Sequence, residues 1–93
     1  MTVTESQRET IRRIAAQHGG ESPMLFGSRA RGDASDDSDL DLIVTLAKDR
    51  SLLDLIAIKQ DLEDALGIPV DVLTPNSISP FMRDQILAEA VPA

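Results

Sequence analysis

The sequence lacks cysteine and contains a single histidine, which limits the chemistry that the chain can support. Without thiols, disulfides and thiolate metal sites are excluded, and one histidine is too few for the usual zinc frameworks. Any metal ion must therefore be bound by oxygen ligands.

Long apolar runs and an excess of basic residues are also missing. The apolar runs are only a few residues long and the N-terminal stretch "MTVTESQRET" is polar, so we expect no membrane span, no signal peptide and a cytoplasmic location. Nine basic residues against sixteen acidic ones give a net charge of −7, which argues against direct nucleic-acid binding by this chain alone.

What is present is the composition of one small globular domain. The chain has 93 residues, of which 42% are hydrophobic and 27% are charged. We therefore expect a single domain over residues 1–93. A domain of this size leaves much of its surface exposed, which favours a protein that works in a complex.

Capping patterns predict the helices. Thr4 followed three residues later by glutamine begins a helix of about residues 4–18, which Gly19-Gly20 ends. Ser51 followed three residues later by aspartate begins a long amphipathic helix that ends at Gly67, with the apolar positions Leu52, Leu55, Ile56, Leu62, Ala65 and Leu66. Ser79-Pro80 has the form of an N-cap and first helical residue, and predicts a last helix towards Ala90 through Met82, Ile86 and Leu87.

Three strands are expected between these helices, at residues 23–26, 39–46 and 68–74. Gly27 permits a sharp turn after the first strand, and Ser28 suits the cap of a following helical turn. The resulting order is αβαβαβα, an α/β or α+β domain with a small mixed sheet packed on helices.

Aspartates interrupt the second and third strands, where aspartate is normally depleted. Leu40, Leu42 and Val44 alternate with Asp39, Asp41 and Ile43, so both carboxylates fall on one face, and Asp71 interrupts the third strand in the same way. If the third strand lies beside the second with matching orientation, the carboxylates converge. Such a cluster repels itself unless a cation is bound, and oxygen ligands of this kind suit Mg²⁺.

Two plainer interpretations stand beside this one. The aspartates of the loop before the second strand, Asp33, Asp36 and Asp37, are typical of a solvated acidic loop. Asp71 alone is also compatible with an edge-strand residue that faces water and has no metal role.

The stretch "FGSRARG" combines a strand end, a glycine turn and a helix start, where outward-pointing N–H groups attract anions such as a triphosphate. It lacks the glycine and lysine spacing of a Walker A loop. The glycine-serine pair, ten intervening residues, Asp-x-Asp and the later "VDVL" together resemble the polymerase-β-type nucleotidyltransferase superfamily. The wider match "GSRARGDASDDSDLDLIV" is similar to the minimal nucleotidyltransferases, the MNT antitoxins that pair with HEPN-domain toxins.

The resemblance implies roles for particular residues. Gly27 and Ser28 would bind the nucleotide phosphates, and Arg29 and Arg31 would contact them as well. Asp39, Asp41 and Asp71 would be the catalytic carboxylates and the ligands of two Mg²⁺ ions, with ATP as the substrate.

The resemblance also implies a function: a Mg²⁺-dependent protein adenylyltransferase that neutralises a HEPN-type ribonuclease toxin, its partner in a hetero-oligomer, by modifying a tyrosine hydroxyl. This chain contains no tyrosine, so the acceptor must come from another molecule. Two alternatives remain open. The chain could neutralise its partner by tight binding without catalysis, or transfer a nucleotide to a small molecule such as an aminoglycoside or to RNA.

Overall fold

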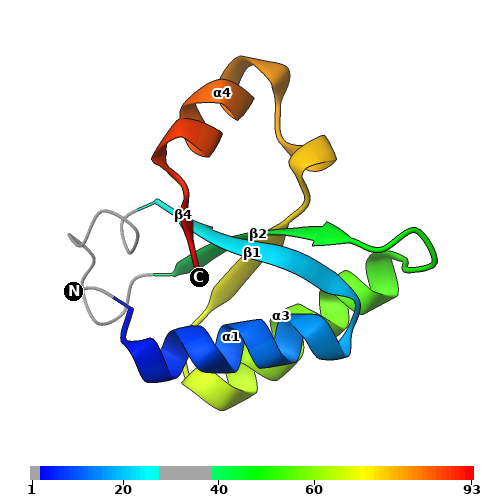
Figure 1. Ribbon diagram of the computed structural model, residues 1–93, viewed down its shortest axis with the longest axis vertical. Coiled ribbons are helices and arrows are strands. Elements are labelled where there is room, and N and C mark those ends of the chain that lie inside the picture. The colour runs from blue at the N-terminus through cyan, green and yellow to red at the C-terminus, as the bar shows by residue number, and fades with distance from the viewer. Residues whose placement is uncertain (1–2, 28–38) are drawn as a thin grey trace.

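The structure is a computed structural model, and it describes residues 3–27 and 39–93. Figure 1 shows the elements. In chain order they are α1 (Glu5–Gln17), β1 (Gly20–Phe26), β2 (Leu40–Leu46), α3 (Leu52–Leu66), β3 (Val70–Leu73), the 3-10 helix η1 (Pro75–Ser77), α4 (Pro80–Glu89) and β4 (Val91–Pro92). The expected helical turn after Ser28 lies outside the described residues. The other predicted helices and strands are all present. The structure also contains η1 and β4, which the sequence did not predict.

The strands form one mixed sheet, as the sequence predicts. Its order is β3-β2-β1-β4, with β1 antiparallel to both β2 and β4, and β2 parallel to β3. Helices α1 and α3 cover one face of the sheet, whereas α4 lies on the other side (Figure 1). The small α+β architecture is therefore confirmed.

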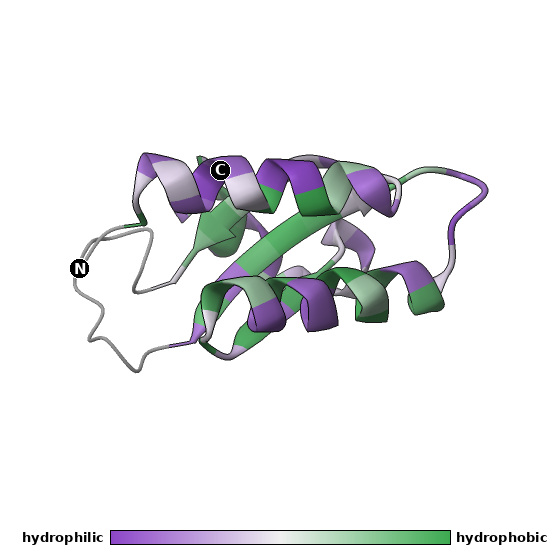
Figure 2. Ribbon diagram, turned by 90° about the horizontal axis from the view of Figure 1, so that it is seen from below, coloured by the Kyte–Doolittle hydropathy of each residue, from purple (hydrophilic) through white to green (hydrophobic). Residues whose placement is uncertain are grey.

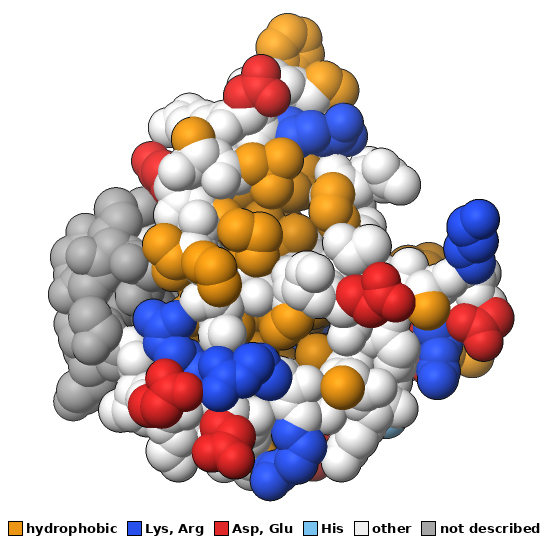
Figure 3. Space-filling view, in the orientation of Figure 1, with side chains coloured by type: hydrophobic (Ala, Val, Ile, Leu, Met, Phe, Trp, Pro, Cys, Tyr) orange, Lys and Arg blue, Asp and Glu red, His pale blue; other side chains and the backbone are white. Residues whose placement is uncertain are grey.

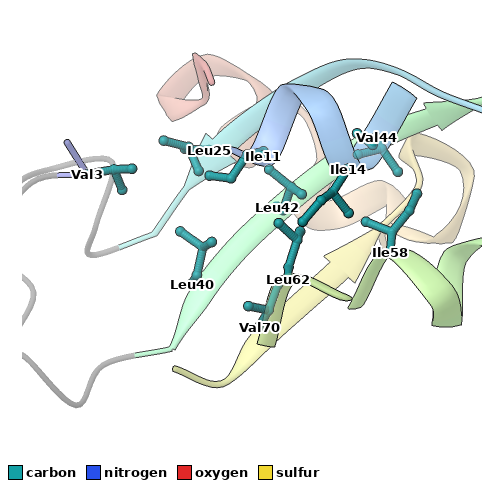
Figure 4. Packing of buried hydrophobic residues seen from close by; sticks show 11 residues of the cluster. Val3, Ile11, Ile14, Leu25, Leu40, Leu42, Val44, Ile58, Leu62 and Val70 are labelled. Atoms are coloured by element: carbon teal, nitrogen blue, oxygen red, sulfur yellow. The ribbon is translucent and has the colours of Figure 1, made fainter. Parts of the chain in front are cut away.

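The hydrophobic core lies between the sheet and the helix pair α1 and α3. Figure 2 shows these two helices side by side with hydrophobic strand segments between them. In Figure 4 the side chains of both helices and of three strands point toward one another. The buried cluster comprises Val3, Ile11, Ile14, Ala15, Leu25, Leu40, Leu42, Val44, Ile58, Leu62 and Val70. Alternate residues of β2 thus face the core, and its other residues face the opposite side.

Both capping boxes are confirmed. The Thr4 N–H donates to the Gln7 side chain at 2.9 Å, and the Gln7 N–H donates to Thr4 Oγ1 at 3.1 Å. At α3, the Ser51 N–H donates to the Asp54 carboxylate at 3.0 Å. Gly67 ends that helix in the left-handed conformation with φ of 71°, as a glycine C-cap requires.

The predicted apolar face of α3 is wrong at three positions, Leu52, Ile56 and Ala65, which are all exposed. Leu52 and Ile56 are 72% and 53% exposed, whereas Ile58 is fully buried. Ile58 and Leu62, four residues apart, define the core face, and two residues of helix turn a side chain by about 200°. Ile56 therefore points away from the sheet.

The strand boundaries also differ from those expected. β1 begins at Gly20 rather than Pro23, because a register shift between Glu21 and Met24 lets the strand continue past an irregular segment. β2 begins at Leu40, so Asp39 lies just outside the strand. β4 has only two residues, too few for a periodic sequence signal. No helix in the described ranges is both long enough and apolar enough to cross a bilayer.

Candidate active site

Asp41 and Asp71 lie side by side on neighbouring strands. Each is the second residue of its strand, β2 or β3, and the two are register partners in the parallel pairing. Their neighbours Leu40 and Val70 are buried on the side of α1 and α3, so alternation directs both carboxylates to the opposite face. The matching strand orientation that the sequence analysis required is therefore present.

The glycine turn at the end of β1 reaches the same place. Phe26 is the register partner of Asp41 in the antiparallel pairing of β1 with β2. Gly27 follows with φ of 77°, and a Cβ on this residue would overlap Asp41 Oδ2. The chain needs glycine here both for its backbone conformation and for the close approach to the carboxylate.

A cavity of about 450 Å³ opens on this face of the sheet. Its volume is in the range of small-molecule sites, roughly 300–1,000 Å³. Figure 3 shows hydrophobic side chains gathered between α4 and the sheet. The cavity is lined by Phe26, Asp41, Lys59, Asp71, Val72, Leu73, Ser77, Ile78, Ser79, Met82 and Ile86. The two acidic side chains thus share a cavity whose other walls are mostly apolar.

The donor chemistry of this pair suits Mg²⁺, because both ligands are carboxylate oxygens on one side of a cavity. Asp39 is exposed and precedes the first residue of β2. Within residues 3–27 and 39–93, no three acidic or histidine side chains form a group that could hold a metal ion. The structure therefore brings together Asp41 and Asp71, and convergence with Asp39 stays a prediction. Magnesium commonly takes only one or two carboxylates and completes its shell with water and phosphate oxygens.

Of the four residues predicted to contact the phosphates, one lies within the described residues. Gly27 lies beside Asp41, whereas Ser28, Arg29 and Arg31 lie outside the described residues. The acidic loop positions Asp33, Asp36 and Asp37 also lie outside them.

Sequence reasoning missed Lys59 and Glu63 of α3. Lys59 lines the cavity, and its Nζ lies 3.0 Å from Glu63 Oε2. The Val70 N–H donates to the Glu63 carboxylate, and this hydrogen bond together with Lys59 holds the pKa of Glu63 below its ordinary value. The only signal in the sequence was the four-residue spacing, which is typical of any helical ion pair.

His18 has a more specific contact than the helix-dipole interaction that its position suggests. Its Nε2 lies 2.7 Å from Asp61 Oδ2, so the pair joins the end of α1 to α3. Neither residue lines the cavity, and the pair connects the two helices of the layer.

Comparisons with known proteins agree with this architecture. A family described as the nucleotidyltransferase domain matches residues 8–92. A protein of Methanocaldococcus jannaschii assigned as a protein adenylyltransferase is 45% identical over 91 residues, which are 98% of this chain and 97% of that protein. The protein adenylyltransferase MntA of Thermococcus cleftensis is 33% identical over 89 residues, 96% of this chain and 86% of the relative.

Solved structures are similar as well. A protein assigned as a minimal nucleotidyltransferase superimposes with a TM-score of 0.86 at 42% identity, covering 95% of this chain and 90% of the other. A chain from the complex of tri-AMPylated Shewanella oneidensis HEPN toxin with MNT antitoxin gives a TM-score of 0.72 at 20% identity, covering 95% and 69%. At that identity the second likeness concerns the fold alone.

Proposed function

This chain belongs to the nucleotidyltransferase domain family, and we propose that it is a Mg²⁺-dependent protein adenylyltransferase. It would transfer AMP from ATP to a tyrosine hydroxyl of a HEPN-domain ribonuclease toxin, and would thereby act as the antitoxin of that toxin. The observation that carries this proposal is the pairing of Asp41 with Asp71 at a cavity beside the Gly27 turn. The relatives named as protein adenylyltransferases support the same reaction class.

In the proposed reaction, the hydroxyl oxygen of the acceptor attacks the α-phosphorus of ATP. A new phosphorus–oxygen bond forms to the acceptor, whose hydroxyl proton is released. The bond between the α-phosphorus and the bridging oxygen breaks, and pyrophosphate leaves. Bound Mg²⁺ would neutralise the phosphates and stabilise the attacking and leaving oxygens. Asp39, Asp41 and Asp71 would hold the two ions, and Asp71 would also help to activate the acceptor hydroxyl.

The turn after β1 would bind the triphosphate. Gly27 has no side chain between its backbone and Asp41, so a phosphate bound at the turn would lie near the carboxylates. Ser28, Arg29 and Arg31 follow in sequence and would supply further polar and positive contacts to the phosphates.

A protein acceptor fits the surface around the cavity. The α4 residues Phe81 and Met82 are 98% and 54% exposed, and Met82 also lines the cavity. Exposed apolar side chains next to a site favour contact with a folded partner over a small, highly charged acceptor. Because this chain has no tyrosine, the acceptor tyrosine must belong to that partner.

The test combines the purified chain, ATP, Mg²⁺ and a HEPN-domain protein that forms a complex with it. Intact mass spectrometry should show the partner gaining one or more AMP groups, with peptide mapping to a tyrosine. Asp41→Asn should abolish the gain, and removal of Mg²⁺ by a chelator should do the same. A partner that stays unmodified with the unaltered chain would reject the enzymatic proposal.

The exposed apolar side chains also favour a second candidate, neutralisation by binding alone. A double variant, Asp39→Asn with Asp41→Asn, separates the two in cells that express the toxin. Full protection by this variant would mean that binding suffices, whereas loss of protection with retained complex formation would mean that adenylylation is required.

A further inference from the structure

Two side chains of α3 bind both backbone polar groups of Val70, the residue before Asp71. Lys59 Nζ donates to the Val70 carbonyl oxygen at 2.8 Å, and the Val70 N–H donates to Glu63 Oε2 at 3.0 Å. Lys59 Nζ also donates to Glu63 Oε2 at 3.0 Å, which closes the network. Helix α3 is thereby attached to the first residue of β3.

β3 needs such support because it is short and lies at the edge of the sheet. It has four residues, and within the described part of the chain it pairs with β2 alone. Successive residues of a parallel strand direct their hydrogen-bonding groups to alternate sides, so Val70 presents its groups to the open edge. A short edge strand held on one side opens more readily than the centre of a sheet.

Glu63 connects the end of α3 to the beginning of β3. Its backbone carbonyl accepts the N–H of the C-cap Gly67 at 2.9 Å, while its side chain binds Val70. The connection at residues 67–69 is therefore fixed at both ends by one residue. Lys59 lines the same cavity as Asp71, so one side chain of the network shares that cavity with the carboxylate.

We infer that Lys59 and Glu63 are positioning residues that fix the direction in which Asp71 presents its carboxylate to the metal and nucleotide. This inference rests on the proposed function, in which Asp71 is a metal ligand. The pair acts through the backbone of Val70 and needs no contact with the substrate. We expect a measurable effect, because a displacement of about 1 Å at a reacting centre can cost about 100-fold in rate.

Four variants test the inference. Glu63→Ala removes both side-chain contacts of Glu63, and Glu63→Gln keeps an oxygen that accepts the Val70 N–H. Lys59→Met removes the contact to the Val70 carbonyl but keeps a chain of similar length. Asp61→Asn is the matched control, since it alters an ion pair of the same helix that contacts His18 instead of β3.

The readout is the backbone amide of Asp71 in ¹⁵N-labelled protein, observed by nuclear magnetic resonance while Mg²⁺ is titrated with a nonreactive ATP analogue present. We expect the Asp71 signal to shift saturably in the unaltered chain and to need roughly tenfold more Mg²⁺ in Glu63→Ala, because loss of a group that orients a metal ligand typically costs about 10–100-fold in metal affinity. Glu63→Gln should recover most of the affinity, and Asp61→Asn should titrate like the unaltered chain.

A purely structural role gives a different pattern. If Glu63→Ala speeds hydrogen exchange at Val70 but leaves the Mg²⁺ titration of Asp71 unchanged, the pair only closes the sheet edge and the inference is overturned. Absence of any Mg²⁺-dependent shift at Asp71 in the unaltered chain overturns it as well. A Glu63-dependent titration in a chain that transfers no AMP to the HEPN partner supports the inference and rejects the proposed function.

Discussion

Asp41 and Asp71 are register partners on adjacent parallel strands, so two negative charges share one face of the sheet at its β3 edge. Like charges at paired strand positions destabilise a sheet by roughly 0.2–1 kcal/mol. A cation bound between the two carboxylates would offset this repulsion. The pair is therefore the feature through which binding and stability are linked.

The variant Asp71→Asn should separate these two properties. We expect its free energy of unfolding without Mg²⁺ to rise by about 0.2–1 kcal/mol because the repulsion is removed. Its rate of adenylyl transfer should fall by about 100-fold or more, since metal stabilisation is worth several kcal/mol. Urea denaturation and intact-mass kinetics measure the two effects, and a variant that is less stable and fully active would contradict both.

Local sequence signals predicted most of this fold. Thr4 and Ser51 identify helix starts because the capping contacts that they make join residues three apart. The alternation of leucine and aspartate in β2 identifies the core face, since strand periodicity is local as well. The sequence could place Asp41 beside Asp71 only on the condition that β2 and β3 are parallel neighbours. Strand order and direction depend on contacts between distant segments, which local patterns do not reveal.

The features that the sequence did not predict also depend on contacts between distant segments. Ile56 and Ile58 are both isoleucines in one helix, and only the packing against the sheet determines which one is buried. The contacts of Lys59 and Glu63 with Val70 cross from a helix to an edge strand, so helical spacing alone gave no indication of them. β4 depends on its pairing with β1 rather than on a periodic pattern.

Gly27→Ala should impair both the fold and the reaction. The new Cβ would overlap Asp41 Oδ2, and the φ of 77° is unfavourable for alanine. Gly67→Ala is the matched control, because its φ is 71° but nothing lies within 4 Å of the added Cβ. The conformational strain alone costs about 1–2 kcal/mol.

We therefore expect Gly67→Ala to lower the free energy of unfolding by about 1–2 kcal/mol with adenylyl transfer retained under folded conditions. Gly27→Ala should be at least as destabilising and should also lose transfer. Urea denaturation of both variants and mass spectrometry of the partner measure this. Equal activities of the two variants would show that the close approach at Asp41 has no role in the reaction.

Ile58→Ala and Ile56→Ala test the core assignment with the same substitution two residues apart on α3. Ile58 is fully buried between the helix layer and the sheet, so its truncation should cost about 2–5 kcal/mol. Ile56 is 53% exposed, and its truncation should change stability by no more than about 0.5 kcal/mol. Thermal and urea denaturation measure the difference, and similar values for the two variants would mean that α3 is rotated.

The Glu63 carboxylate makes the free energy of unfolding depend on pH under acidic conditions. The Val70 N–H, followed by Lys59, lowers the pKa of Glu63 in the folded chain, whereas the unfolded chain has the ordinary value of about 4.3. The unfolded state therefore takes up a proton first as the pH falls, and the stabilising contribution disappears once the folded-state pKa is passed. Relative to Glu63→Gln, the unaltered chain should show a constant advantage in free energy of unfolding above about pH 5, which shrinks below about pH 4. Urea denaturation at a series of pH values gives this difference directly, and an advantage that grows on acidification would mean that the carboxylate is not the partner of Val70.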